Sequence, residues 1–215
     1  MPEFLQKGGP LMWLLLVCSV VAVAVFLERT IYLHRAAIRV GEMLRGLSNL
    51  LATGNIAEAL QECSSTPGPA ARVMRAVLLK HDLPRSELRD IAQDAGQLEV
   101  PRLERNLGVL VTIIYVAPLI GLLGTVVGLV QAFTEVSAQG GYATAAEISA
   151  GVYQSLLTTA AGLAVCIPTL LAYQFLSTRV NEIMHDMERA GIEIIMLITD
   201  LRRGGSAQER RAEEQ

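Results

Sequence analysis

The stretch from residue 148 to 178, ISAGVYQSLLTTAAGLAVCIPTLLAYQFLST, is long enough to cross a bilayer and carries no charged residue. On a helix at 100° per residue, its small and polar side chains fall within an arc of roughly 140°. This arc holds Gln154, Ser155, Thr158, Thr159, Gly162, Cys166 and Thr169. The opposite side holds Leu156, Leu163, Ile167, Leu170 and Leu171. The apolar face suits lipid or packing, and the polar face either lets helices approach closely or lines something polar.

The composition is that of a membrane protein. The mean hydropathy is +0.41, with 52% hydrophobic and only 18% charged residues. The net charge of -3 comes from interleaved acidic and basic residues, which argues against a nucleic-acid-binding surface. Cys18, Cys63 and Cys166 have no metal-ligand spacing and are interpreted as buried apolar residues. No metal and no cofactor is expected.

Three apolar segments predict an all-α protein with three membrane spans, at residues 11–27, 107–133 and 148–178. A cleaved signal peptide is the alternative for the first of them. The run lacks a small-residue cleavage site before Glu28 and Arg29, so a retained span is favoured. Residues 1–10 form a short lead, and residues 134–147 a loop between the second and third spans.

Residues 28–106 form a hydrophilic segment that is predicted to be helical. Asn55 is expected to cap a short helix, with Glu58 three residues later as its capping-box partner. The sequence TPGP at 66–69 should end that helix, and Pro84 should interrupt the chain again before a helix that opens near Ser86. The segment contains no phosphate-binding loop, metal cluster or nucleophile motif.

The sequence predicts that two helices extend well beyond the bilayer on the same side. The helix from Ser86 has no strong terminator before the second span, although Pro101 could kink it. A single rod from Ser86 to Phe133 would be about 70 Å long at 1.5 Å per residue. The third span is expected to continue as a helix over residues 179–201, followed by a disordered tail at 202–215.

Basic residues are distributed unevenly around the spans. Residues 28–106 hold 11 Lys or Arg and the chain from residue 179 holds 6, whereas residues 134–147 hold none and the lead holds only Lys7. The positive-inside rule therefore predicts that the amino terminus and the 134–147 loop face the periplasm, with the large segment and the tail in the cytoplasm.

The second span, LGVLVTIIYVAPLIGLLGTVVGLVQAF, carries glycines on one face. Gly121, Gly124 and Gly128 cluster there, and the last two form a GxxxG pattern. Close helix packing explains these glycines, with Gly162 in the third span. The glycines alone leave Pro118 and Thr125 of the second span unexplained. Pro118, and Pro168 in the third span, are assigned with the glycines to helix packing.

The segments APLIGLLGTVVGLVQAF and AGVYQSLLTTAAGLAVCIPTLLAY resemble the paired signatures of the MotA/TolQ/ExbB proton-channel family. The resemblance covers about residues 10–200 in layout and is most specific over 99–178. Three spans, a long cytoplasmic segment and a short outer loop are similar to the ExbB and TolQ branch, whereas the four-span MotA type fits less well.

The resemblance implies a pentameric ring in the bacterial inner membrane. The ring would enclose the single transmembrane helices of two copies of an ExbD/TolR-like partner, and proton or sodium flow beside a partner aspartate would drive movement of the partner. Thr125 and Thr159 match the family threonines and would face the pore. Thr158, also on the polar arc, is expected to matter less than Thr159.

One residue departs from the family pattern. ExbB and TolQ usually carry a glutamate five residues before the threonine of the third span, where this chain has Gln154. An amide does not exchange a proton near neutral pH, so the titratable group would come from the partner. Glu135 and Glu147 bracket the outer loop and are expected to be solvated surface residues.

The favoured function is a non-enzymatic ion-channel subunit of an energy-transducing motor. A structural membrane scaffold without ion conduction, and a sodium-driven or motility stator of the same family, are the alternatives. An enzyme is disfavoured because the sequence shows no nucleophile with a base, no metal set and no phosphate loop.

Overall fold

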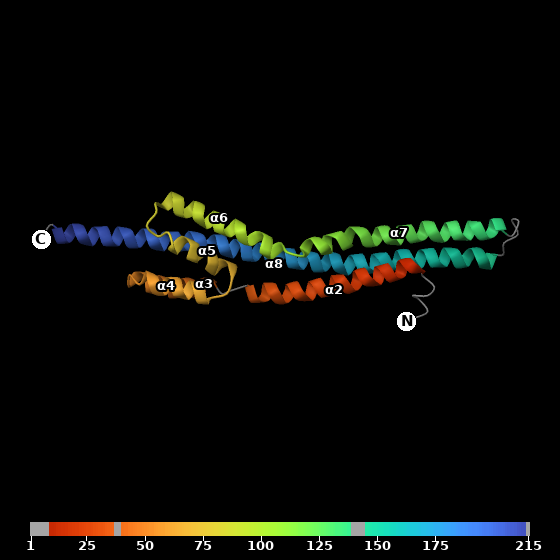
Figure 1. The fold of residues 1–215 in the computed structure, drawn as a ribbon, viewed down its shortest axis with the longest axis horizontal. Coiled ribbons are helices and arrows are strands. Elements are labelled where there is room, and N and C mark those ends of the chain that lie inside the picture. The colour runs from red at the N-terminus through yellow and green to blue at the C-terminus, as the bar shows by residue number, and fades with distance from the viewer. Residues whose placement is uncertain (1–8, 37–39, 139–144, 214–215) are drawn as a thin grey trace. The chain divides into compact units, whose positions relative to one another are not determined.

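The structure is a computed structural model that describes residues 9–36, 40–138 and 145–213, and every regular element in these ranges is a helix (Figure 1). The helices are α2 Pro10–Ala36, α3 Val40–Ala52, α4 Ile56–Ser65, α5 Pro69–Leu78, α6 Arg85–Glu104, α7 Leu107–Ala138 and α8 Ala145–Glu213. Three helical segments, in α2, α7 and α8, are long and apolar enough to cross a membrane. The predicted all-α class with three spans is therefore confirmed.

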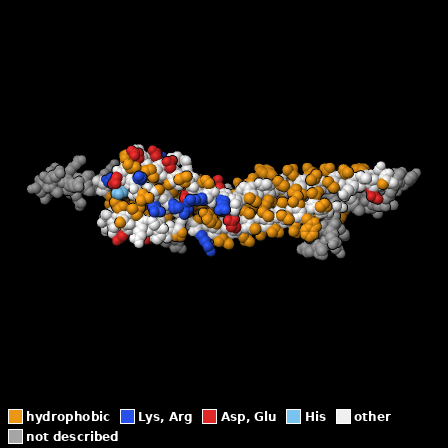
Figure 2. Space-filling model, in the orientation of Figure 1, with side chains coloured by type: hydrophobic (Ala, Val, Ile, Leu, Met, Phe, Trp, Pro, Cys, Tyr) orange, Lys and Arg blue, Asp and Glu red, His pale blue; other side chains and the backbone are white. Residues whose placement is uncertain are grey.

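The chain divides into two compact units. We call residues 1–30 and 106–177 the membrane unit, and residues 31–105 and 178–215 the second unit. Large apolar side chains are exposed on the membrane unit, among them Leu119, Phe133 and Leu171, at 62%, 72% and 66%. Orange side chains cover this part of the molecule in Figure 2. Such exposure suits contact with lipid or with other apolar helices.

The breaks between the short helices follow the sequence, but one predicted cap does not form. α4 ends at Ser65 before the TPGP sequence, and α6 begins directly after Pro84. Asn55 is the N-cap residue of α4, yet its side chain makes no capping hydrogen bond, so the predicted capping box with Glu58 is wrong. With φ −91° and ψ 69°, Asn55 lies outside the extended conformation in which a cap side chain reaches the first helical N–H groups.

The predicted rod from Ser86 to Phe133 is also wrong, because it is interrupted between α6 and α7. Pro101 remains inside α6, and the break falls at Arg105 and Asn106. Asn106 has a left-handed φ of 63°, which asparagine tolerates better than most residues. Its side-chain Nδ2 donates to Glu28 Oε2 over 2.9 Å. This hydrogen bond connects the start of α7 to α2 within the membrane unit.

The third span and the end of the chain are more helical than expected. α7 extends to Ala138 and α8 starts at Ala145, so the connection is shorter than the predicted 134–147 loop. α8 continues to Glu213, through most of the tail that was predicted to be disordered. No proline follows Pro168, and the alanine, glutamine, glutamate and arginine residues of the tail all favour helix.

The second unit has its own apolar core. One stripe of α8 is buried at helical spacing, with the members Val180, Ile183, Met187, Ala190, Ile194 and Ile198. α4 contributes Ala59 and Cys63, and α5 contributes Val73, Met74, Val77 and Leu78. Burial raises the pKa of the Cys63 thiol to about 11, so this cysteine stays protonated near neutral pH. Its interpretation as a buried apolar residue is confirmed.

Candidate functional site

α7 and α8 lie side by side in the membrane unit, and glycines allow their backbones to approach closely (Figure 1). A Cβ atom built at Gly124 would lie 2.4 Å from Thr158 Cγ2. A Cβ atom built at Gly162 would lie 2.6 Å from the carbonyl oxygen of Ala117. Both distances are shorter than any real Cβ contact, so only glycine fits at these two positions without a shift of the helices.

The contact extends along both helices in antiparallel order. Gly121 lies against the backbone of Thr159, and Gly128 against Ser155. Further along, Gly151 of α8 lies against Ala132, whose Cβ would be 2.8 Å from a Cβ at position 151. The sequence interpretation overlooked Gly151. Small residues at 151, 155, 158 and 162 recur every three or four positions, and this spacing is the signal that could have found it.

Most hydroxyl groups of the polar arc are turned back to their own helix. Ser155, Thr158 and Thr169 are only 3%, 1% and 5% exposed. They donate to the carbonyl groups of Val152, Gln154 and Val165, respectively. Within one chain these three side chains therefore fill helix contacts, and Thr158 in particular is covered by Gly124.

Two side chains of the arc donate across the helix contact instead. The Thr159 hydroxyl donates to the carbonyl oxygen of Gly121 on α7 over 3.0 Å, with its own-helix acceptor, Ser155, farther away at 3.3 Å. Cys166 Sγ donates to the carbonyl oxygen of Ile114 over 3.3 Å. Thr159 is half-buried, so its hydroxyl is still accessible from one side.

Pro118 and Cys166 are explained together by the second of these contacts. Proline has no N–H group, so Pro118 cannot bond the carbonyl four residues earlier, which is that of Ile114. The Cys166 thiol donates a hydrogen bond to this carbonyl oxygen instead. Cys18 and Cys166 are only partly buried, so the prediction of buried apolar cysteines is wrong for these two. Cys166 instead satisfies a backbone group that the proline leaves open inside the span.

The remaining predicted site residues lie elsewhere on the membrane unit. Thr125 is half-buried and donates to Leu122 of its own helix. Gln154 approaches the start of α2, since its Nε2 would lie 3.1 Å from a Cβ on Gly9. Pro168 is exposed in a groove between α2 and α8, which Phe26 and Phe175 also line. Glu135 is exposed as expected, whereas the side chain of Glu147 lies outside the described part of the chain.

The membrane unit offers hydrogen-bonding groups but no charge at mid-span. Residues 107–134 and 148–178 contain no Asp, Glu, Lys or Arg. Among the residues that the structure describes, no group of His, Cys, Asp and Glu side chains is arranged to hold a metal ion. Hydroxyl groups in such a setting can hydrogen-bond water or a carboxylate but do not release or take up a proton at neutral pH.

Three apolar helices with a glycine-packed pair and accessible hydroxyls define a polytopic membrane protein with a polar helix contact at mid-span. The chain belongs to the MotA/TolQ/ExbB proton channel family, whose model matches residues 65–189. The matched region includes all of α6 and α7 and most of the apolar part of α8.

Three relatives place the chain in the ExbB and TolQ branch. An ExbB-like biopolymer transport protein of Synechocystis sp. is 31% identical over 93% of this chain and 79% of its own length. An ExbB homolog of Methanothermobacter thermautotrophicus is 29% identical over 86% of this chain and 66% of its own length. The Tol-Pal system protein TolQ of Haemophilus influenzae is 41% identical over 41% of this chain and 38% of its own length.

Proposed function

We propose that this chain is the ion-channel subunit of an energy-transducing motor in the bacterial inner membrane. Copies of the chain form a pentameric ring around the single transmembrane helices of two ExbD/TolR-like partners. Ions, protons in the first instance, move down the membrane potential beside the partner, and each charge releases about 2.3 kcal/mol per 100 mV for movement of the partner.

The observation that carries this proposal is the half-buried Thr159 hydroxyl at the contact of α7 and α8. It donates to the Gly121 carbonyl, one helical turn from the half-buried Thr125 on the same helix as Gly121. Polar atoms from two helices are thus gathered at mid-span, where most of the surface is hydrocarbon. A carboxylate or water beside them would find hydrogen-bond donors that a lipid-facing surface lacks.

Thr159→Val tests the proposal, because valine keeps the shape and removes the hydroxyl. Interhelical hydrogen bonds in membranes contribute only about 0.6 kcal/mol on average, so the variant should fold and assemble. Loss of a hydrogen bond worth about 1–1.5 kcal/mol from the ion path should lower flux by roughly tenfold. Flux is measured in vesicles that contain the chain and its partner, with a pH-sensitive dye for protons and with sodium in the control buffer.

Thr158→Val is the matched control, since Thr158 is adjacent in sequence and buried against Gly124. It should leave flux near the wild-type level once the amount of assembled protein is equal. Thr125→Val should lower flux as Thr159→Val does, and a comparable loss in Gln154→Ala would add the amide to the path. Wild-type flux in both Thr125→Val and Thr159→Val, with the ring intact, would contradict the pore assignment and favour a structural scaffold without ion conduction.

The proposed orientation puts the amino terminus in the periplasm and α6 in the cytoplasm, as the distribution of basic residues indicates. In a chain otherwise free of reactive cysteines, Gly140→Cys should react with a membrane-impermeant thiol reagent added outside intact spheroplasts. Lys80→Cys, at an exposed position between α5 and α6, should react only after the membrane is opened. The reverse pattern would contradict the orientation.

A further inference from the structure

An apolar groove lies between α6 and α8, and both of its walls belong to the second unit (Figure 1). Its volume is about 410 Å³, so it can accept several side chains at once. A second hollow at the start of α6 adjoins it, because Arg89, Ile192 and Ile195 line both. The lining residues of α6 run from Arg85 to Val100, about 22 Å along the helix. The groove is therefore long enough to hold about four turns of another helix.

Gly96 lines this groove, and packing within one chain does not explain why it is a glycine. Nothing lies within 4 Å of a Cβ atom built at this position. In the middle of a helix, glycine costs about 0.5–1 kcal/mol relative to alanine. Ile192, on the facing helix, is large and apolar and is 54% exposed. An open glycine beside an exposed isoleucine indicates a surface that takes up an apolar side chain from another molecule.

The start of the groove carries two arginines. Arg85 and Arg89 are exposed, and neither makes a hydrogen bond or an ion pair with any residue that the structure describes. Glu188, one turn of α8 before Ile192, also lines the groove, and its Oε2 lies 3.7 Å from His185 Nδ1. The Arg85 end of the groove is therefore positive and suits a surface that carries carboxylates.

A matching surface lies on another side of the same helix. Glu87, Asp90, Asp94 and Leu98 recur at a spacing of three or four residues, so they share one face of α6, roughly 140° round the helix from the groove residues. All four side chains are exposed, Leu98 by 74%. We call these four residues the acidic face. It offers three carboxylates followed by one large apolar side chain.

The two surfaces carry their features in the same order along α6. In the groove the arginines precede Gly96, and on the acidic face the carboxylates precede Leu98. Copies related by rotation about one axis keep each residue at the same height along that axis, so neighbours in a ring meet at similar positions in the chain. Gly96 and Leu98 differ by two residues, about 3 Å along the helix. The two surfaces are thus in register between rotated copies.

We propose that the groove between α6 and α8 of one copy receives the acidic face of α6 of the next copy. Leu98 of that copy enters the groove beside Gly96, and its carboxylates lie against Arg85 and Arg89. The contact is heterologous, since two different surfaces meet, and repeated contacts of this kind can close a ring. The proposal rests on the proposed association of copies and is independent of ion conduction.

Chemical cross-linking of the full chain in membrane vesicles tests this contact. Two differently tagged copies are expressed together in a background whose native cysteines are replaced by serine or alanine, one with Gly96→Cys and the other with Leu98→Cys. A short bis-maleimide should join the two copies, whereas either variant alone should give little product. A chain with both substitutions should give products larger than a dimer, because each copy then contacts two neighbours. Leu79→Cys with Gly96→Cys is the matched control, since Leu79 is 56% exposed and lies outside both surfaces.

Charge reversal tests the ionic part of the contact. Arg89→Glu places like charges opposite each other and should lower the yield of the cross-link about fivefold or more. Asp90→Arg should lower it similarly, and both substitutions in every copy should restore most of the yield. Residues adjacent in a helix do not face each other, so this recovery would arise between copies. Lys80→Glu changes the net charge as much as Arg89→Glu, at an exposed position outside both surfaces, and should leave the yield unchanged.

Several results would overturn the proposal. Absence of the cross-link in a sample of intact oligomeric mass would refute this contact and leave the proposed ring standing, whereas a monomer in native mass spectrometry would refute both. Dimers without larger products from the doubly substituted chain would indicate a closed two-fold contact instead. Equal loss of yield in Lys80→Glu would reduce the charge effect to net charge. Cross-linking of Gly96→Cys to another protein, but not to a second copy, would assign the groove to a different partner.

Discussion

Replacing Gly124 with leucine is expected to separate α7 from α8 and to abolish the proposed ring. A Cβ at this position would lie 2.4 Å from Thr158 Cγ2 and 2.7 Å from Thr158 Cβ, so the helices themselves would have to move. Overpacking of this kind costs about 1–3 kcal/mol even for small groups, and leucine adds three more carbon atoms. Native mass spectrometry should show loss of the oligomer, and thermal unfolding in detergent should occur at lower temperature.

Gly108→Leu is the matched control, because nothing lies within 4 Å of a Cβ at Gly108 on the same helix. A compensating pair gives a stronger test of the contact. Gly124→Ala should destabilise the protein, and the addition of Thr158→Gly, which removes both clashing carbon atoms, should recover part of the loss. Normal assembly of Gly124→Leu, or an equal defect in Gly108→Leu, would contradict this account of the packing.

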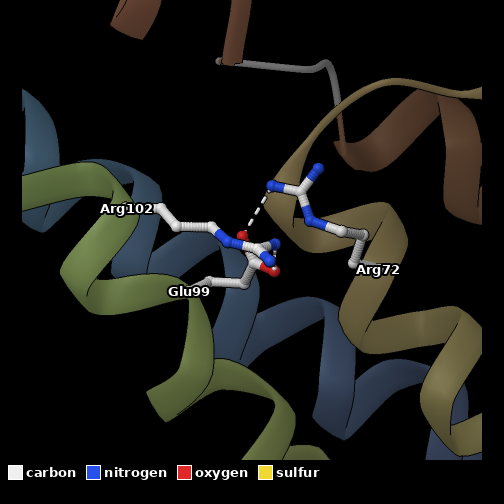
Figure 3. Close-up of polar contacts among 3 residues, drawn as sticks. All are labelled: Arg72, Glu99 and Arg102. Carbon is white, nitrogen blue, oxygen red and sulfur yellow. Dashed lines mark hydrogen bonds and ion pairs between the residues drawn. The ribbon is translucent and has the colours of Figure 1, made fainter.

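Replacing both Arg72 and Arg102, which donate to the buried carboxylate of Glu99 (Figure 3), with methionine is expected to destabilise the second unit strongly. Glu99 would keep its carboxylate at 5% exposure with neither of its two partners. Removal of the partners of a buried charge typically costs about 3–5 kcal/mol. Hydrogen exchange of the full chain should show faster opening of α5 and α6 in this variant, while α7 stays protected.

Removal of the carboxylate should be far less damaging than removal of the arginines. In Glu99→Met, Arg72 and Arg102 remain largely exposed and hydrated, so no buried charge is left without a partner. The triple replacement of all three residues by methionine should therefore be more stable than the double arginine variant. Equal stability of the double and triple variants would show that Glu99 does not depend on its arginines.

Much of the fold could be read from the sequence because membrane spans need long uncharged apolar runs. The three spans and the breaks at TPGP and Pro84 follow from hydrophobicity and from the missing N–H group of proline, which act locally. The capping box at Asn55 and the continuous rod through residue 106 were wrong for a different reason. Both depend on the backbone angles of single residues, which neighbouring segments such as the one carrying Glu28 help to set.

The sequence predicted which residues form the polar face of the third span. It could not predict which of these residues are buried against α7 and which stay accessible. Thr158 and Thr159 are adjacent threonines in the same apolar run, and no local rule distinguishes them. The structure buries Thr158 under Gly124 and directs the Thr159 hydroxyl to Gly121. The rotation of α8 about its axis relative to α7 decides this difference, and that rotation depends on packing along the whole contact.

The sequence by itself determined the class of this protein: its three spans, its glycine and threonine signatures and its membership of a channel family. These properties are encoded by composition and spacing, which do not depend on the final packing. Only the tertiary structure showed that Cys166 satisfies the carbonyl that Pro118 leaves open, and that Glu99 binds Arg72 and Arg102. The residues of these contacts come from different helices, and a hydrogen bond forms only where folding brings its donor and acceptor within about 3 Å.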